Sequence, residues 1–280
     1  MTFSVRDAET VAEILLAAAE AEIMPRFRSL GEGAIREKTS AEDLVTDADV
    51  AAEKVIAAAL VKAFPGAVVI GEESVSARPA LLDELDGADL AFVVDPVDGT
   101  KNFASGLPLF GVMAATIVRG EIVGGVILDP VGQDWAIGVR GEGAFTLTKD
   151  GRRVPLAVAA AKPAATMSGT ASWSTLPEPL RSQLCANLAN TRSAANYRCA
   201  AHEYRMIAGG HSHFALFSKI NVWDHAAGWI LHREAGGHTA RFDASPYSPL
   251  HREGGLLCAP SEAAWHDLHA ALFVGTQYAA

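Results

Sequence analysis

The sequence predicts a layered α/β (α+β) fold, and three patterns support this prediction. Apolar residues at Val11, Ile14 and Leu15 recur at helical spacing near the N-terminus. Short apolar runs, such as Leu90 to Val94, end at acidic or glycine-containing turns and predict buried strands. Beyond about residue 150, short strand-like runs alternate with helical segments. This alternation is typical of proteins in which helices cover β-sheets.

The first half of the chain is predicted to contain two helices and a meander of strands. The first helix includes Val11 to Ile23, and Pro25 bends or ends it. The second helix starts after Thr46, a favourable N-cap, and runs to about Phe64. A short extended segment or loop is expected at 35–40, and a loop with a short helix at 76–89. Strands are expected at 67–70, 90–94, 112–118, 121–128, 133–139 and 144–148.

The character of the chain changes around Asp150-Gly151, where we place a subdomain boundary. An N-terminal α+β subdomain would comprise residues 1–150, and a C-terminal α/β subdomain would comprise residues 151–280. The second part contains no internal repeat, and its helices are expected at 179–189, 202–209, 224–235 and 261–273.

Composition excludes several classes of protein. Half of the 280 residues are hydrophobic, which allows a large core, and the formal net charge is −10, which argues against nucleic acid as a partner. No uncharged apolar run approaches the roughly 18 residues of a membrane span, and no signal peptide is evident. The three cysteines suggest neither a disulfide framework nor a Cys-rich zinc site. We therefore expect a cytoplasmic protein without a membrane partner.

The most informative segment is Asp95-Pro96-Val97-Asp98-Gly99-Thr100, which follows an apolar strand-like run. Pro96 favours an extended conformation at Asp95, and Gly99 allows the backbone to turn sharply. Both carboxylates can then point into one pocket at the carboxyl end of a strand, where α/β sheets usually bind ligands. Two carboxylates this close repel each other unless a cation lies between them, which indicates a site for Mg²⁺. The alternative is a solvated Asp-rich turn.

Three other acids stand at the boundaries of predicted elements. Glu72 also follows an apolar run, so it would meet Asp95 at one sheet edge if the two strands are neighbours. Asp224 begins an apolar helix, and Asp49 lies in the first turn of the second helix. Taken singly, Asp224 could be a helix N-cap, Glu72 a surface turn acid and Asp49 an ordinary first-turn acid. Together, they are the ligands that a site with several cations needs.

The chain resembles the inositol monophosphatase superfamily of metal-dependent, lithium-sensitive phosphatases over nearly its whole length. The resemblance rests on four segments in the expected order: Asp43 to Asp49, Gly71 to Ser74, Asp95 to Phe103, and Trp223 to Gly228 with Glu234 to Gly237 after it. It implies the five-layer αβαβα sandwich of the inositol monophosphatase and fructose-1,6-bisphosphatase type. It also implies a homodimer.

The resemblance implies two to three Mg²⁺ ions per active site. Glu72, Asp95 and the carbonyl oxygen of Val97 would hold the first ion. Asp95, Asp98 and Asp224 would hold the second, so that Asp95 bridges the two ions. A third ion would bind more weakly near Glu72. All of these ligands except Asp224 fall in the N-terminal subdomain.

The resemblance also implies the catalytic and substrate-binding groups of a phosphatase. Glu72 and Thr100, with Asp49 beside Thr100, would position the attacking water for direct in-line displacement without a phospho-enzyme. Gly99 and Thr100 would donate backbone N–H groups to the phosphate, close to Asp98. Lys38 matches a basic residue at the phosphate entrance, although it could equally be a solvated loop lysine.

The resemblance implies that the substrate is a small phosphorylated metabolite, with inositol 1-phosphate as the default. Phe217 stands where inositol phosphatases carry an acid that contacts hydroxyl groups, and a phenyl ring cannot accept those hydrogen bonds. Cys199 and Ala200 are the nearest match to the family's small Gly-Ser/Thr-Ala segment. Histidinol phosphate and 3′-phosphoadenosine 5′-phosphate, the substrate of 3′(2′),5′-bisphosphate nucleotidases, are therefore rivals, and Phe217 could also be ordinary core packing.

Two other classes of function stay open. A regulatory member of the same fold would bind another protein rather than turn over a substrate. Such a protein would not need all five active-site residues, so their presence favours catalysis: Glu72, Asp95, Asp98, Thr100 and Asp224. A zinc hydrolase could use the histidines between residues 202 and 238. His211 and His213 are two residues apart and could share one face of a strand.

Overall fold

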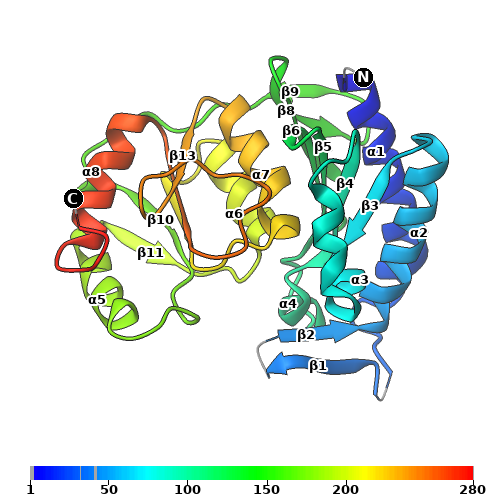
Figure 1. Ribbon diagram of the computed structural model, residues 1–280, viewed down its shortest axis with the longest axis horizontal. Helices are drawn as coiled ribbons and strands as arrows, with labels where there is room; N and C mark the ends of the chain where they lie inside the picture. The colour runs from blue at the N-terminus through cyan, green and yellow to red at the C-terminus, as the bar shows by residue number, and fades with distance from the viewer. Residues whose placement is uncertain (1–2, 32, 41–42, 280) are drawn as a thin grey trace.

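Seven strands form the first sheet of the computed structural model, which describes residues 3–31, 33–40 and 43–279 (Figure 1). Strands β3 and β4 are parallel, and every later neighbour is antiparallel, so that β4 to β9 form a meander in the order β3-β4-β5-β6-β7-β8-β9. The strands are β3 (Val68–Gly71), β4 (Ala91–Asp98), β5 (Gly111–Val118), β6 (Glu121–Asp129), β7 (Asp134–Val139), β8 (Gly143–Thr148) and β9 (Arg153–Pro155).

Helices α1 (Val5–Ala18) and α2 (Asp47–Ala63) cover the outer face of this sheet. A π-helical segment, Ala19–Ile23, continues α1 and ends before Pro25. Thr46 caps α2 through a capping box with Asp49, and Pro65-Gly66 follows its end. The first helix was predicted from the spacing of its apolar residues, and the second from its N-cap and its stop signal.

Helices α6 (Ala200–Ala208) and α7 (Val222–Glu234) cover the inner face. Two strand glycines allow α7 to approach the sheet closely: a Cβ atom at Gly125 would lie 2.5 Å from the carbonyl oxygen of Ala227, and one at Gly138 would lie 2.8 Å from the Cα atom of Leu231. Since backbone atoms cannot move aside as side chains do, these glycines determine the position of α7.

A second sheet lies on the far side of α6 and α7. Its strand order is β11-β10-β12-β14-β13. The strands are β10 (Ser168–Ala171), β11 (Ser193–Ala195), β12 (Phe214–Phe217), β13 (His238–Arg241) and β14 (Leu256–Ala259). Helices α5 (Leu180–Asn187) and α8 (Glu262–Phe273) pack over its outer face.

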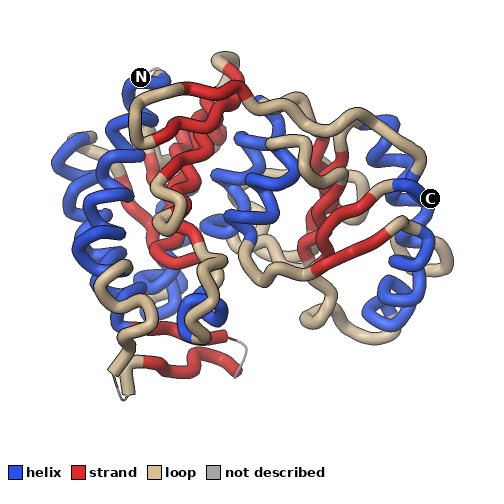
Figure 2. Tube along the Cα trace, turned by 180° about the vertical axis from the view of Figure 1, so that it is seen from behind, coloured by secondary structure: helices blue, strands red, loops and turns tan. Residues whose placement is uncertain are grey.

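The molecule therefore has five layers, in the order α1/α2, first sheet, α6/α7, second sheet, α5/α8 (Figures 1 and 2). Three apolar clusters fill the spaces between successive layers, and the largest of them surrounds α6 and α7. The αβαβα architecture expected from the sequence is confirmed. The chain passes from the first sheet to the second between β9 and β10. Helices α6 and α7 pack against both sheets, so the sheets share a core. The division into two subdomains near residue 150 therefore stays a proposal.

Several elements differ from the predictions. The strand expected at 90–94 continues to Asp98, so both acids of the central segment lie within β4 rather than after it. Helix α3 (Glu72–Ala77) was not predicted because six residues carry too little periodicity, and β2 (Asp43–Thr46) and β9 were missed for the same reason. The hairpin partner of β2 is β1 (Ile35–Ser40), and a 3₁₀ helix spans Pro79–Leu85. No helix of the described residues is long and apolar enough to cross a membrane.

Replacing Gly125 by alanine tests the close approach of α7 to the first sheet. We expect Gly125→Ala to lower the free energy of unfolding by about 1–3 kcal/mol, because the added methyl group meets helix backbone. Gly31→Ala is the control, since a Cβ atom there has no neighbour within 4 Å. Urea unfolding of both variants measures the difference, and equal stabilities would show that the approach of α7 does not depend on Gly125.

Candidate metal centre

Glu72 and Asp95 lie at one edge of the first sheet, because the strands that precede them are parallel neighbours. Val94 of β4 pairs with Gly71 of β3, so each strand delivers an acid to the same edge. This adjacency was the condition set by the sequence for a shared site, and it is met. Glu72 then begins α3, and Asp95 continues along β4.

The end of β4 is irregular, and this irregularity turns two acids toward one side. The pairing with β5 shifts between Asp95 and Asp98. The backbone N–H of Val97 donates to Oδ1 of Asp95 at 3.0 Å. Gly99 has φ of +86°, and a Cβ atom there would lie 3.0 Å from the carbonyl oxygen of Leu109. A residue with a side chain would therefore be strained at this turn.

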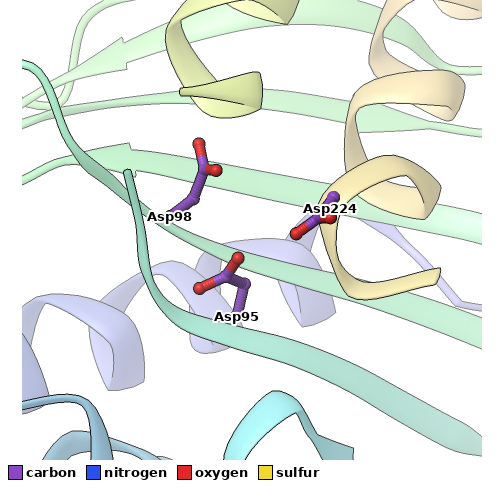
Figure 3. A group of neighbouring side chains, drawn as sticks. All are labelled: Asp95, Asp98 and Asp224. Atoms are coloured by element: carbon purple, nitrogen blue, oxygen red, sulfur yellow. The ribbon is translucent and has the colours of Figure 1, made fainter. Parts of the chain in front are cut away.

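Asp224 approaches the same place from the other half of the molecule. It lies in the first turn of α7, whose N-cap is Asn221, so the simple N-cap alternative for Asp224 is wrong. The Nδ2 group of Asn221 donates to Oδ2 of Asp224 at 3.1 Å. Carboxylate oxygens of Asp95, Asp98 and Asp224 lie within 4.8 Å of one another, and Figure 3 shows the three side chains around one space.

Burial and neighbouring carboxylates disfavour the ionisation of Asp95 and Asp224. Burial, followed by the charges of Glu72, Asp98 and Asp224, raises the pKa of Asp95 well above its ordinary value. Burial and the charge of Asp98 raise the pKa of Asp224 to about 7. A divalent cation removes this repulsion, and an all-oxygen donor set suits Mg²⁺. The residues present therefore fit the metal that the sequence implies.

Asp98 is held by the start of α6 as well as by its own strand. Its Oδ2 atom accepts from the backbone N–H of Ala201 at 2.6 Å and from the Cys199 thiol at 3.0 Å. Burial raises the pKa of Asp98, and these two hydrogen bonds oppose the shift. The Cys199 side chain thus contacts a predicted metal ligand, and Ala200 lines the same cavity.

Glu72 and Val97 flank the three aspartates. Glu72 lines a cavity of about 330 Å³ together with Asp98 and Asp224, although it is not one of the three acids that cluster within 4.8 Å. The carbonyl oxygen of Val97 accepts from the hydroxyl of Thr100 at 2.9 Å. Their roles as ligands of a first ion stay a prediction.

Asp49 and Thr100 lie within hydrogen-bonding distance, as the resemblance implies. The Thr100 hydroxyl is 3.0 Å from Oδ1 of Asp49, while Oδ2 of Asp49 accepts from the backbone N–H of Thr46 at 2.9 Å. Asp49 therefore joins the cap of α2 to the turn at the end of β4. The side chain of Lys38 lies outside the described residues.

Phe217 both lines the cavity and packs into the core. It is 4 % exposed, its ring stacks on Tyr204 at 4.9 Å, and it meets the ring of His225 edge-on at 4.7 Å. Burial lowers the pKa of His225 to about 3, so this imidazole is neutral near pH 7. Both interpretations of Phe217, core packing and cavity wall, therefore describe its position.

The histidines form no comparable cluster. His211 is exposed, and Nδ1 of His213 lies 3.3 Å from the carbonyl oxygen of Ser168. Within the part of the chain that the structure describes, the one group of three metal-ligating side chains is that of Asp95, Asp98 and Asp224. The geometry therefore gives no support to a zinc site at His211 and His213.

Glu53 of α2 is a residue that the sequence analysis missed. Its carboxylate accepts from the backbone N–H groups of Glu73 at 2.7 Å and Ser74 at 2.9 Å, and also from the Ser74 hydroxyl. It therefore caps the first turn of α3, which begins with Glu72. A Cβ atom at Gly71 would lie 2.1 Å from Cδ of Glu53. The missed signal is a carboxylate on the apolar face of α2.

Comparing the wild type with Asp224→Asn tests the electrostatics of the cluster. The folded-state pKa of Asp224 lies above its ordinary value of 3.8, so the folded state keeps a proton that the unfolded state loses. The stability that this proton contributes is present below about pH 4 and is lost as the pH rises through about 7. With divalent ions removed by a chelator, we expect Asp224→Asn to gain stability relative to the wild type over this range.

Thermal unfolding at several pH values measures this difference. Excess Mg²⁺ is expected to stabilise the wild type more at about pH 8 than at about pH 5, because its ligands must be deprotonated. The variant comparison removes the contributions of other buried groups, such as His225. A difference between the two proteins that does not change with pH would contradict the raised pKa.

Glu53→Gln tests whether the cap of α3 positions Glu72. The amide loses one acceptor and brings N–H donors toward the backbone N–H groups of Glu73 and Ser74. We expect the affinity for Mg²⁺ to fall by about tenfold or more, the effect usual for a group that orients a metal ligand. Calorimetric titration with Mg²⁺ measures it, with the exposed Glu13→Gln on α1 as the control. Equal affinities in the two variants would make Glu53 a purely structural residue.

The family model of the inositol monophosphatase family matches residues 5–278. The "Nus factor SuhB" of Haemophilus influenzae is 31% identical over 181 residues, 62% of this chain and 64% of that protein. The "Inositol-1-monophosphatase" of Rhizobium meliloti is 31% identical over 180 residues, 62% of this chain and 65% of that protein. The "Histidinol-phosphatase" of Mycobacterium tuberculosis is 33% identical over 156 residues, 54% of this chain and 59% of that protein. The matches thus span about 60% of the length of these curated relatives.

Solved structures match over almost the whole chain. The extragenic suppressor protein suhB of Bartonella henselae has a TM-score of 0.82 and 27% identity, covering 96% of this chain and 98% of that one. The Thermotoga maritima IMPase has a TM-score of 0.76 and 22% identity, covering 94% and 97%, and supports the fold alone. With a family model that covers nearly all of its residues, the chain belongs to the inositol monophosphatase family.

Proposed function

We propose that the protein hydrolyses a small phosphate monoester in a Mg²⁺-dependent reaction. The observation that carries this proposal is the cluster of Asp95, Asp98 and Asp224 beside the Gly99-Thr100 turn. Asp98 and Asp224 line the same cavity as this turn. Such a cluster attracts divalent cations, and the turn offers backbone N–H groups beside it. Membership of a phosphatase family supports the same reaction.

The proposal gives each of these residues a role. Glu72, Asp95 and the Val97 carbonyl would hold one Mg²⁺, and Asp95, Asp98 and Asp224 a second. Bound Mg²⁺ neutralises phosphate charge and lowers the pKa of a coordinated water. Thr100 and Glu72 would orient the attacking water, and Asp49 would fix the Thr100 hydroxyl through the 3.0 Å contact. Gly99 and Thr100 donate N–H groups to the phosphate, and no phospho-enzyme forms.

Inositol 1-phosphate is the default substrate of this proposal, in line with the name of the Rhizobium meliloti relative. Histidinol phosphate is the first rival, in line with the name of the Mycobacterium tuberculosis relative, and 3′-phosphoadenosine 5′-phosphate is the second. Phe217 offers no hydrogen-bond acceptor to a polyol, which weakens the case for inositol 1-phosphate. A cytoplasmic homodimer is part of the same proposal.

A regulatory, protein-binding role is the second candidate. The observation that favours it is the name "Nus factor SuhB" of the Haemophilus influenzae relative. Catalysis remains the first candidate because this chain has Glu72, Asp95, Asp98, Thr100 and Asp224, and a binding role does not require all five.

Phosphate release from a panel of esters tests the proposal. The panel contains inositol 1-phosphate, histidinol phosphate, 3′-phosphoadenosine 5′-phosphate and sugar phosphates, each with and without Mg²⁺. We expect one substrate to exceed the others by orders of magnitude, and only with Mg²⁺. Negligible release from every ester, by folded protein that binds Mg²⁺, would instead favour the regulatory role.

Asp95→Asn tests the bridging ligand. We expect turnover to fall by at least about a hundredfold, because one bound cation contributes several kcal/mol to transition-state stabilisation. Circular dichroism is expected to show an unchanged fold. The matched control is Asp86→Asn, which alters an exposed aspartate after the 3₁₀ helix. Near-normal turnover in Asp95→Asn would show that the reaction does not depend on the Asp95 carboxylate.

A further inference from the structure

The cavity beside the acidic cluster is also lined by three cationic residues. Lys101, Arg198 and Lys219 line it together with Glu72, Asp98 and Asp224. Lys101 belongs to α4 (Thr100–Ala104), Arg198 immediately precedes Cys199 at the start of α6, and Lys219 follows β12 by two residues. Three separate segments thus bring cationic side chains to the wall of one cavity.

Arg198 and Lys219 are exposed, and neither makes an ion pair within the described parts of the chain. Lys219 lines the same cavity as Asp224 of the candidate metal centre. Other arginines are paired with acids, for example Arg205 with Asp134. Cations left without a carboxylate at a cavity wall are available to an anionic ligand.

Arg198 adopts a strained backbone conformation that neighbouring groups hold in place. Its φ is +53°, a left-handed conformation that non-glycine residues seldom adopt. The side chain of Asn196 accepts from the Arg198 N–H at 2.9 Å. The guanidinium Nη2 donates to Oδ1 of Asn102 at 3.1 Å. Strained backbone that neighbours hold in place is concentrated at functional sites.

Asn102 connects Arg198 to the turn that would bind phosphate. It is a buried residue of α4, the short helix that starts at Thr100, and it is 1 % exposed. Its Nδ2 group donates to the carbonyl oxygens of Leu109 at 2.9 Å and Tyr197 at 2.8 Å. The Arg198 guanidinium is therefore held at a fixed place relative to Gly99 and Thr100.

The cavity wall near Lys219 also carries hydroxyl groups. Ser218 contacts the hydroxyls of Ser172 at 3.1 Å and Thr175 at 2.6 Å, and all three residues line the cavity. The neighbouring Phe217 is apolar. Glu203 also lines the cavity but is 2 % exposed, and its Oε1 accepts from the N–H of Tyr197 at 3.0 Å. The exposed groups on this wall thus suit an anion better than an uncharged polyol or a cation.

We propose that Arg198 and Lys219 form a subsite for a second anionic group, a phosphate or a carboxylate, on the substrate whose phosphate ester lies at the Asp95, Asp98 and Asp224 cluster. This inference rests on the proposed phosphatase function and narrows its substrate class. Among the candidates, 3′-phosphoadenosine 5′-phosphate carries such a group. Inositol 1-phosphate has an uncharged ring beyond its phosphate, and histidinol phosphate has a cationic amine there.

Two matched pairs of esters test the subsite and separate the two kinds of anion. In the first pair, fructose 1,6-bisphosphate carries one phosphate more than fructose 1-phosphate. In the second pair, 3-phosphoglycerate carries a carboxylate that glycerol 3-phosphate lacks. We expect the wild type to have a kcat/KM at least about tenfold higher for the doubly anionic member of one pair, the effect of about one charged hydrogen bond. The pair that shows the preference identifies the anion.

Arg198→Gln and Lys219→Gln remove each charge while retaining a polar, uncharged side chain. We expect either change to reduce the preference for the doubly anionic ester by about tenfold, with the larger part of the loss in KM. Arg192→Gln is the control, because Arg192 is exposed and does not line the cavity. It is expected to keep the wild-type preference.

The failures of the two proposals can be told apart. Mg²⁺-dependent hydrolysis without a preference for the doubly anionic esters would overturn the subsite and leave the phosphatase in place. An equal loss of kcat/KM for both esters of a pair in Arg198→Gln and Lys219→Gln would also overturn the subsite. The two cations would then contact only the phosphate that is hydrolysed. If no ester is hydrolysed, the phosphatase proposal fails. Calorimetric binding of both pairs of esters with Mg²⁺ then decides the subsite, and equal affinities within both pairs overturn it.

Discussion

Repulsion among the carboxylates of Asp95, Asp98 and Asp224 is the constraint on which the candidate site depends. The structure holds their oxygens within 4.8 Å of one another, and burial together with the neighbouring charges raises the pKa values of Asp95 and Asp224. The remainder of the fold must supply the energy that keeps these acids together. A bound divalent cation would turn the same arrangement from unfavourable to favourable.

The five-layer packing supplies this energy through elements of several layers. Gly125 and Gly138 allow α7 to lie against the first sheet, which carries Asp224 to the edge where β4 ends. Backbone N–H groups at the start of α6 hold Asp98, and Glu53 of α2 caps the helix that begins with Glu72. The site is therefore assembled by three layers of the molecule rather than by one loop.

Local sequence patterns predicted most of the long helices and strands and the pair Asp95 and Asp98, whereas the family resemblance implied that Asp224 joins them. The stop at Pro65-Gly66, the meander glycines and the apolar run before Asp95 each act within a few residues. Short elements such as α3 and β2 were missed because they are stabilised by tertiary contacts, which local propensity does not record. Glu53, Asn102 and Arg198 were missed because their partners are distant in sequence, as the contact between Arg198 and Asn102 illustrates.

Diffraction from crystals soaked in Mn²⁺, a divalent ion with an anomalous signal, tests the central claim most directly. The account predicts an anomalous peak about 2.0–2.6 Å from carboxylate oxygens of Asp95, Asp98 and Asp224, the range expected for divalent ions bound by oxygen. A second peak between Asp95 and Glu72 would identify the other ion. Absence of any peak at the aspartates, or a peak confined to His211 and His213, would contradict the account.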